Sequence, residues 1–130
     1  MHRQVVVTLL TLSLVPAAVQ ATDRVSFQLR NAQDLIDLCA TPEDDAAAEA
    51  ARGFCYGFLA GAYQHAVAVS GGDHEKVGVC LPEPKPTRAE VAAKFVAWGQ
   101  ANPQHTGESA VDALFRFGHG TWPCAKKKSR

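Results

Sequence analysis

The chain lacks an excess of charge of either sign, and it lacks a long uninterrupted apolar run. Thirteen Lys and Arg residues balance 13 Asp and Glu residues, so no basic excess points to nucleic acid binding. No stretch of about 18 or more apolar residues occurs, which predicts no membrane-spanning helix in the mature chain. With 130 residues, 47% of them apolar and 20% charged, the composition is typical of one packed globular domain.

The motifs of a small enzyme or a metalloprotein are also missing. No C-x-x-C pair occurs, which argues against a zinc knuckle, a redox pair and a c-type haem site. His65, His74, His105 and His119 are scattered and show no metal-ligand spacing. Cys55 and His65 would lie roughly 15 Å apart along one helix, too far to act as nucleophile and base. We therefore predict no catalytic site, no metal and no cofactor.

The first 21 residues are predicted to be a signal peptide. Residues 1–4 carry a positive charge, residues 5–15 form an uncharged apolar run, and Pro16 breaks it. Val19-Gln20-Ala21 then places small residues where signal peptidase cleaves. Cleavage after Ala21 would leave residues 22–124 as the folded domain and 125–130 as a basic tail. We expect the mature protein to be periplasmic.

Export changes the interpretation of the four cysteines, Cys39, Cys55, Cys80 and Cys124. In an oxidising compartment an even number of cysteines indicates two disulfides. Three pairings are possible, and the spacing does not decide among them. We favour Cys55–Cys80 with Cys39–Cys124, because the loop after the long helix can fold back and the C-terminus must dock on the domain.

Every strong periodic signal in the mature chain is helical. Asn31 is a candidate N-cap for a short first helix. Thr41-Pro42 is predicted to open the longest helix, with acidic residues 43–45 in its first turn and its end near Ser70. A polar loop is expected over residues 73–79.

Two further helices are predicted after that loop. Thr87-Arg88-Ala89-Glu90 is a capping box, and the helix that it opens should end near Asn102-Pro103. Thr106 is expected to cap the last helix, which should end at Gly118 and Gly120. The fold class is therefore all-α, a small bundle of four to five helices joined by two disulfides.

Three glycines recur at intervals of four in the longest predicted helix: Gly53, Gly57 and Gly61. Each costs about 1 kcal/mol relative to Ala in a helix interior. Such residues are useful where another backbone must approach closely. We interpret them as a site of tight helix packing within the chain, with a homodimer interface as the alternative.

The order of motifs resembles the Rap/Tai family of immunity proteins. The matching elements are Leu38-Cys39, Cys55-Tyr56-Gly57-Phe58 with Gly61, Cys80-Leu81-Pro82, Asn102-Pro103 and Trp122-Pro123-Cys124. Members of that family are small exported helical proteins of Gram-negative bacteria. They protect the producing cell against peptidoglycan amidase toxins delivered by type VI secretion systems. The resemblance covers about residues 34–124.

The resemblance implies a binding protein that covers the active site of a papain-like amidase toxin. By position, Asp73, His74, Glu75 and Lys76 are the candidate contact loop, with Tyr63 or Tyr56 as an aromatic anchor. The alternative from another functional class is a periplasmic binding or stress-chaperone module without a toxin partner. Such a module should expose apolar surface when acidified.

Overall fold

The computed structural model describes residues 24–126, so the predicted signal peptide and most of the basic tail lie outside it. Five α-helices occur in this region: α1 (Ala32–Cys39), α2 (Ala48–Val69), α3 (His74–Val77), α4 (Arg88–Ala101) and α5 (Ala110–Thr121). Two short 3-10 helices, η1 (Arg24–Gln28) and η2 (Pro103–His105), complete it. The predicted all-α fold class is confirmed for the described residues.

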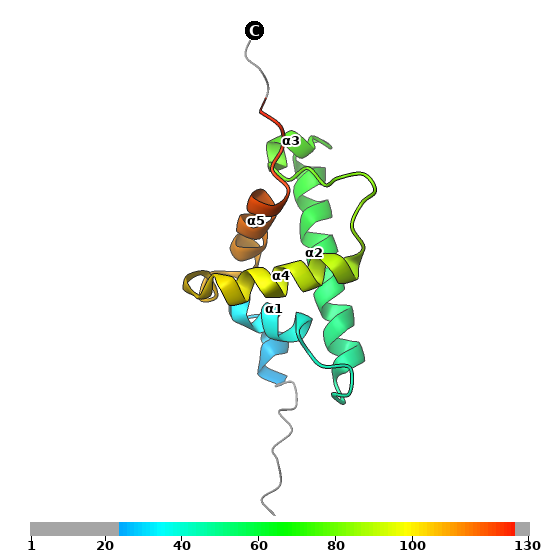
Figure 1. The fold of residues 1–130 in the computed structure, drawn as a ribbon, viewed down its shortest axis with the longest axis vertical. Coiled ribbons are helices and arrows are strands. Elements are labelled where there is room, and N and C mark those ends of the chain that lie inside the picture. Colours follow the sequence, from blue (N-terminus) through cyan, green and yellow to red (C-terminus); the bar gives the residue numbers. More distant parts are fainter. Residues whose placement is uncertain (1–23, 127–130) are drawn as a thin grey trace, which may run out of the picture.

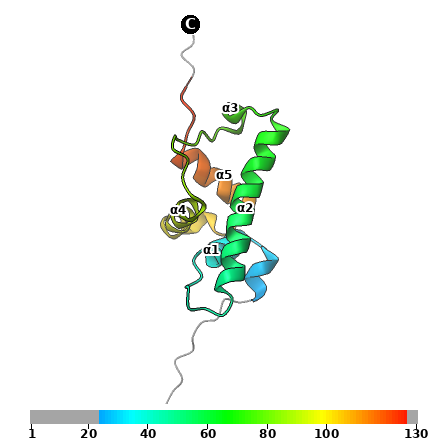
Figure 2. The ribbon, with the colours of Figure 1, turned by 90° about the vertical axis from the view of Figure 1, so that its right-hand side faces the viewer.

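Helix α2 is the longest element, and the other helices are arranged around it. In Figure 1, α4 crosses α2 near its middle, while α1 and α5 lie on either side of α4. The view turned by 90° shows α4 end-on beside α2 (Figure 2). Helices α1 and α4 contact each other, and each also contacts α2 and α5, so these two helices join the bundle.

The core lies where these helices meet and is built on aromatic contacts. Phe95 of α4 is fully buried and meets Phe117 of α5 edge to face, with ring centroids 5.5 Å apart. Phe117 in turn meets Trp122 at 5.4 Å. Such pairs contribute about 1 kcal/mol each beyond the burial of their apolar area. The remaining buried members of the core are aliphatic or small: Leu35, Ile36, Cys55, Leu59, Ala92, Ala110 and Leu114.

Two helix starts agree with the sequence prediction. The Asn31 side chain accepts a hydrogen bond from the backbone N–H of Asp34 at 3.1 Å. The predicted capping box is present, because Thr87 Oγ1 accepts from the Glu90 N–H and the Glu90 carboxylate accepts from the Thr87 N–H. Helix α4 ends at Ala101, directly before the predicted Asn102-Pro103 stop.

The predicted start of the longest helix is wrong. Helix α2 begins at Ala48 rather than at Thr41-Pro42, and acidic residues 43–45 lie in the preceding turn. The Asp45 carboxylate accepts a hydrogen bond from the backbone N–H of Ala47 at 2.7 Å. A side chain that binds a nearby backbone N–H in this way competes with helix formation.

The last helix and the polar loop also differ from their predictions. Ser109, not Thr106, caps α5, because the Thr106 hydroxyl donates instead to the Pro103 carbonyl. Helix α5 continues through Gly118 and Gly120 to Thr121. The loop predicted over residues 73–79 contains the single helical turn α3.

Two disulfides form as predicted, but the favoured pairing is wrong. The bonds join Cys39 to Cys55 and Cys80 to Cys124. Cys39 ends α1, and α1 packs against α2 at the buried Cys55, with 5.2 Å between the two Cα atoms. The backbone N–H of Cys80 donates to the Trp122 carbonyl, which brings residue 80 beside the C-terminal segment.

Candidate functional site

The predicted contact loop forms one rigid exposed turn at the end of α2. Asp73 caps α3, because its Oδ1 accepts from the backbone N–H groups of Glu75 at 3.0 Å and Lys76 at 3.2 Å. The Lys76 ammonium lies 3.9 Å from Asp73 Oδ2. His74, Glu75 and Lys76 are all exposed. The turn therefore presents one imidazole, one carboxylate and one ammonium to solvent in a fixed order.

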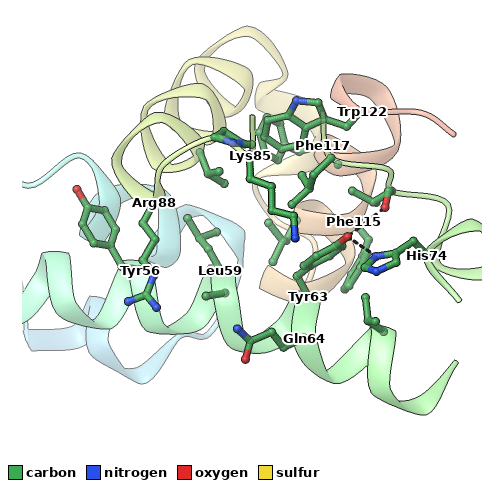
Figure 3. Close-up of a pocket in the computed structure, with 18 of the residues that line it drawn as sticks. Tyr56, Leu59, Tyr63, Gln64, His74, Lys85, Arg88, Phe115, Phe117 and Trp122 are labelled. Atoms are coloured by element: carbon green, nitrogen blue, oxygen red, sulfur yellow. Dashed lines mark hydrogen bonds between the residues drawn. The ribbon is translucent and has the colours of Figure 1, made fainter. Parts of the chain in front are cut away.

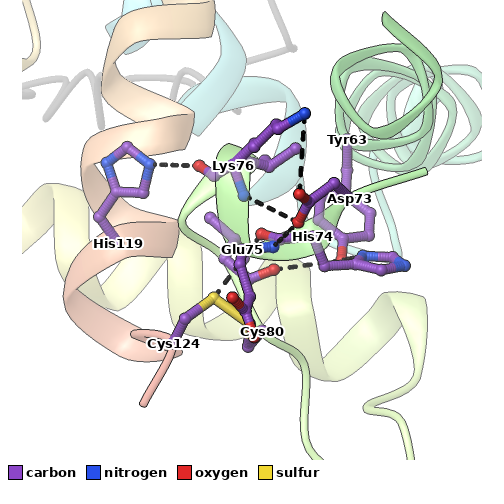
Figure 4. The surroundings of a disulfide bond; sticks show 10 residues. Tyr63, Asp73, His74, Glu75, Lys76, Cys80, His119 and Cys124 are labelled. Atoms are coloured by element: carbon purple, nitrogen blue, oxygen red, sulfur yellow. Dashed lines mark hydrogen bonds and ion pairs between the residues drawn. A yellow bond between two sulfur atoms is a disulfide. The ribbon is translucent and has the colours of Figure 1, made fainter. Parts of the chain in front are cut away.

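Contacts from α5 and the C-terminal segment hold this turn in place (Figure 4). The ring Nε2 of His119 donates a hydrogen bond to the Val77 carbonyl at 2.9 Å. Gly78 ends the turn with φ +77°, and a Cβ there would lie 3.2 Å from the His119 ring. The Cys80–Cys124 disulfide then closes the segment onto the C-terminus. The turn is thus fixed by contacts from elements distant in sequence.

Tyr63 of α2 contacts the α3 turn through its hydroxyl group. Its hydroxyl lies 2.7 Å from His74 Nδ1 and 3.3 Å from the Val79 carbonyl oxygen. Because the carbonyl only accepts, both contacts are satisfied when Tyr63 donates to Val79 and the Nδ1–H of His74 donates to Tyr63. Burial raises the pKa of the Tyr63 hydroxyl. The structure therefore brings Tyr63 and His74 together, with Tyr63 half-buried.

An apolar groove of about 560 Å³ adjoins the turn (Figure 3). One wall is a face of α2, and the others come from α5, the segment at residues 79–86, the first turn of α4 and the C-terminal segment. Tyr63 and His74 form part of its lining. The aromatic and aliphatic residues of the lining include Leu59, Val67, Val79, Leu81, Val91, Leu114, Phe115, Phe117 and Trp122.

Two cations line the same groove. Figure 3 shows the Lys85 side chain extending toward Tyr63 and the Arg88 side chain extending toward α2. Both side chains belong to exposed residues, and neither lies in an ion pair with a carboxylate of the described chain. No Asp or Glu is present among the described residues that line the groove. The groove therefore combines apolar walls with positive charge.

The sequence prediction missed the groove and its two cations. No local motif marks residues 83–86 as part of a site, and the Glu83–Pro84 bond within them is cis. The lining comes from segments that are far apart in the sequence, so no local pattern identifies it. The proline-rich run before the capping box was the one available signal, because prolines hold a segment extended over a neighbouring surface.

The glycine interpretation needs correction. Gly53, Gly57 and Gly61 are exposed, and a Cβ at any of them would meet nothing within 4 Å in the described chain. They lie on the face of α2 opposite to the buried Cys55 and Leu59, so they do not serve packing between the described helices. The homodimer alternative stays a prediction.

The described residues do not meet the requirements of a metal site, a nucleophilic cysteine or a membrane-spanning helix. No group of three or more His, Cys, Asp or Glu side chains there is arranged to hold a metal ion. Cys55 is bonded to Cys39 and therefore has no thiolate with which to act as a nucleophile. No helix between residues 24 and 126 is long and apolar enough to cross a membrane.

Comparison with known proteins identifies the family. The family model of the Rap1a immunity proteins matches residues 31–124, which run from the N-cap of α1 to the second disulfide. Searches of curated proteins and of solved structures find no match. Since the match spans all five α-helices and both disulfides, the chain belongs to the Rap1a immunity protein family.

Proposed function

We propose that this protein is a periplasmic immunity protein that binds a peptidoglycan amidase toxin of a type VI secretion system and covers its active site. The family match over residues 31–124 is the observation that carries the proposal. It covers the whole helical bundle rather than one motif. The toxin class and the mode of inhibition go beyond the family match and come from the resemblance described above.

The α3 turn is the proposed contact with the toxin. Its side chains at His74, Glu75 and Lys76 are exposed, while its backbone is held by Asp73 and by the Cys80–Cys124 disulfide. A turn that is ordered before binding loses little conformational entropy when the complex forms. This favours a high affinity from a small contact area.

Steric exclusion is the proposed mechanism. A papain-like amidase needs its Cys and His open to water and to the peptide substrate. A rigid turn inserted into that cleft blocks both, so no chemistry by the immunity protein is required. The charged order of residues 74–76 would set which toxin is recognised, because mispaired charges in an interface are costly.

Periplasmic localisation is part of the same proposal. Two disulfides are typical of an oxidising compartment, which supports export. The predicted signal peptide, residues 1–21, lies outside the described residues. Signal cleavage is tested by N-terminal sequencing of the protein recovered from the periplasm, which should begin at Thr22.

Charge reversal in the turn tests the contact. Glu75→Arg should weaken binding to the cognate amidase by tenfold or more, the effect expected of an interface hot spot. Glu43→Arg is the matched control, because Glu43 is also exposed but lies before the opposite end of α2. Adding His74→Ala should weaken binding further while leaving the fold unchanged by circular dichroism. If Glu75→Arg and the double variant Glu75→Arg/His74→Ala both bind as tightly as the wild type, the α3 turn is not the contact.

The exposed glycine face of α2 is the proposed surface for a homodimer. Gly57→Leu would place a bulky side chain at the centre of this face. Ala97→Leu, at an exposed position of α4, is the control. Sedimentation velocity of the wild type should show a dimer, and Gly57→Leu alone should convert it to a monomer. A wild type that is monomeric at all concentrations would exclude this use of the face.

A further inference from the structure

The groove between α2 and α5 adjoins the proposed toxin contact and shares Tyr63 and His74 with it, but most of its lining lies outside the α3 turn. We propose that it is a binding site for a small amphipathic carboxylate, with the apolar chain between α2 and α5 and the carboxylate at Lys85 or at Arg88, whose cationic ends lie at different parts of the groove (Figure 3). This inference goes beyond the immunity function and does not depend on it. Three properties of the groove support it: its walls, its dimensions and its charge.

The walls suit an apolar chain. Leu59 and Val67 of α2 and Leu114 and Phe117 of α5 line the groove, and Trp122 of the C-terminal segment contributes an aromatic side chain. An apolar body placed between these side chains would be removed from water on several sides. Small-molecule sites in proteins have this lining, with few polar groups that fix orientation.

The dimensions suit a small and elongated ligand. The groove volume of about 560 Å³ falls within the range of known small-molecule sites, roughly 300–1,000 Å³. Its α2 wall runs from Tyr56 to Ala68. At about 1.5 Å per residue, that wall is roughly 18 Å long, enough for an extended acyl chain.

The charge selects an anionic head group. Lys85 and Arg88 line the groove, and among the described residues no carboxylate shares the lining with them. Glu90 lies in the first turn of the helix that Arg88 begins, but its carboxylate accepts hydrogen bonds from the N–H and hydroxyl of Thr87. Either cation, beside apolar walls, would bind a carboxylate through charge-assisted hydrogen bonds, and the second would add attraction at longer range. A neutral or cationic ligand would gain nothing from them.

The protein contains a suitable reporter for this site. Trp122 lines the groove, whereas Trp98 is outside the lining and stacks on Phe95 and His105. Replacing Trp98 by Phe leaves Trp122 as the only tryptophan. Titration of this variant of the mature, oxidised protein with dodecanoate, below its micelle concentration, should change the Trp122 emission. Calorimetry should give one site per chain.

Charge variants and ligand variants test the assignment. The double variant Lys85→Glu/Arg88→Glu should weaken dodecanoate binding by tenfold or more. The matched control Arg52→Glu/Lys94→Glu makes the same change of charge at exposed positions outside the lining and should bind as the wild type does. Dodecanol, which has the same chain without the charge, should bind at least tenfold more weakly than dodecanoate.

A second variant fills the groove without changing its charge. Val67→Phe adds volume to the α2 wall and should also weaken dodecanoate binding, with circular dichroism confirming the fold. The proposal is overturned if dodecanoate does not bind, if the two double variants bind equally, or if dodecanol binds as well as dodecanoate. It is also overturned if only an acidic, apolar peptide binds, because the groove would then be a protein contact. None of these outcomes depends on toxin binding by the α3 turn.

Discussion

The same substitution, Gly to Ala, should change stability in opposite directions in two helices. Gly57 is an exposed residue inside α2, and a Cβ there would meet nothing within 4 Å in the described chain. Gly57→Ala therefore gains helix propensity, about 1 kcal/mol, without any clash. We expect the free energy of unfolding to rise by that amount.

Gly99 in α4 presents the opposite case. A Cβ at Gly99 would clash with the Cδ1 atom of Ile36 and lie 3.0 Å from its Cγ1 atom. Ile36 is a core residue with 4% of its surface exposed, so it has little room to move. Overpacking of this kind costs about 1–3 kcal/mol. After the gain in propensity of about 1 kcal/mol, Gly99→Ala should lower the stability by up to about 2 kcal/mol.

Urea unfolding followed by circular dichroism measures both variants against the wild type, with both disulfides intact. The difference between the two variants should be about 1–3 kcal/mol, seen as opposite shifts of the midpoint at unchanged slope. The measurement is made at two protein concentrations, because a dimer through the Gly57 face would make the midpoint depend on concentration. If Gly99→Ala is as stable as Gly57→Ala, the described packing of α1 on α4 is wrong.

Two further predictions concern α1. The double variant Cys39→Ala/Cys55→Ala removes the first disulfide, which joins residues with a sequence separation of 16. The loss of chain constraint should lower the free energy of unfolding in urea by about 3 kcal/mol. An unchanged midpoint would argue against the Cys39–Cys55 pairing. The side chain of Arg30 donates to the buried carboxylate of Asp34 at 2.8 and 2.9 Å and, by this hydrogen bonding, lowers the pKa of Asp34. Because its pKa is lowered in the folded protein, the Asp34 carboxylate contributes stability above the unfolded pKa of about 3.9, and this stability is lost as the pH falls through the folded pKa. Asp34→Asn should therefore be less stable than the wild type at pH 7. It should also lose less stability than the wild type on acidification. The exposed Asp44→Asn is the control for loss of one carboxylate at pH 7, where it should be as stable as the wild type. Identical pH profiles for Asp34→Asn and the wild type would contradict the role of Asp34.

Local signals in the sequence predicted the parts of the fold that local chemistry determines. The N-cap at Asn31 and the capping box at Thr87 are short-range hydrogen bonds, and both occur as expected. The start of α2 was missed because the Asp45 side chain binds the Ala47 backbone, which outweighs the capping potential of Thr41.

The disulfide pairing and the groove depend on tertiary structure, and the sequence pattern could not identify either. Cys39 meets Cys55 because α1 packs on α2, a contact that no spacing specifies. Lys85 and Trp122 line one groove although they are far apart in the chain. The candidate contact turn at Asp73–Lys76 was located by position in the chain, while its rigidity follows from contacts with α5 that only the structure describes.

The measurement that tests the central claim most directly is capture of the partner followed by an activity assay. The mature, oxidised protein is immobilised and exposed to periplasmic and secreted proteins of its own species, and the bound proteins are identified by mass spectrometry. We expect recovery of a small cysteine amidase whose cleavage of peptidoglycan stops when about one copy of this protein is added per toxin. Recovery of many unrelated proteins, or of an amidase that stays fully active in the complex, would contradict it.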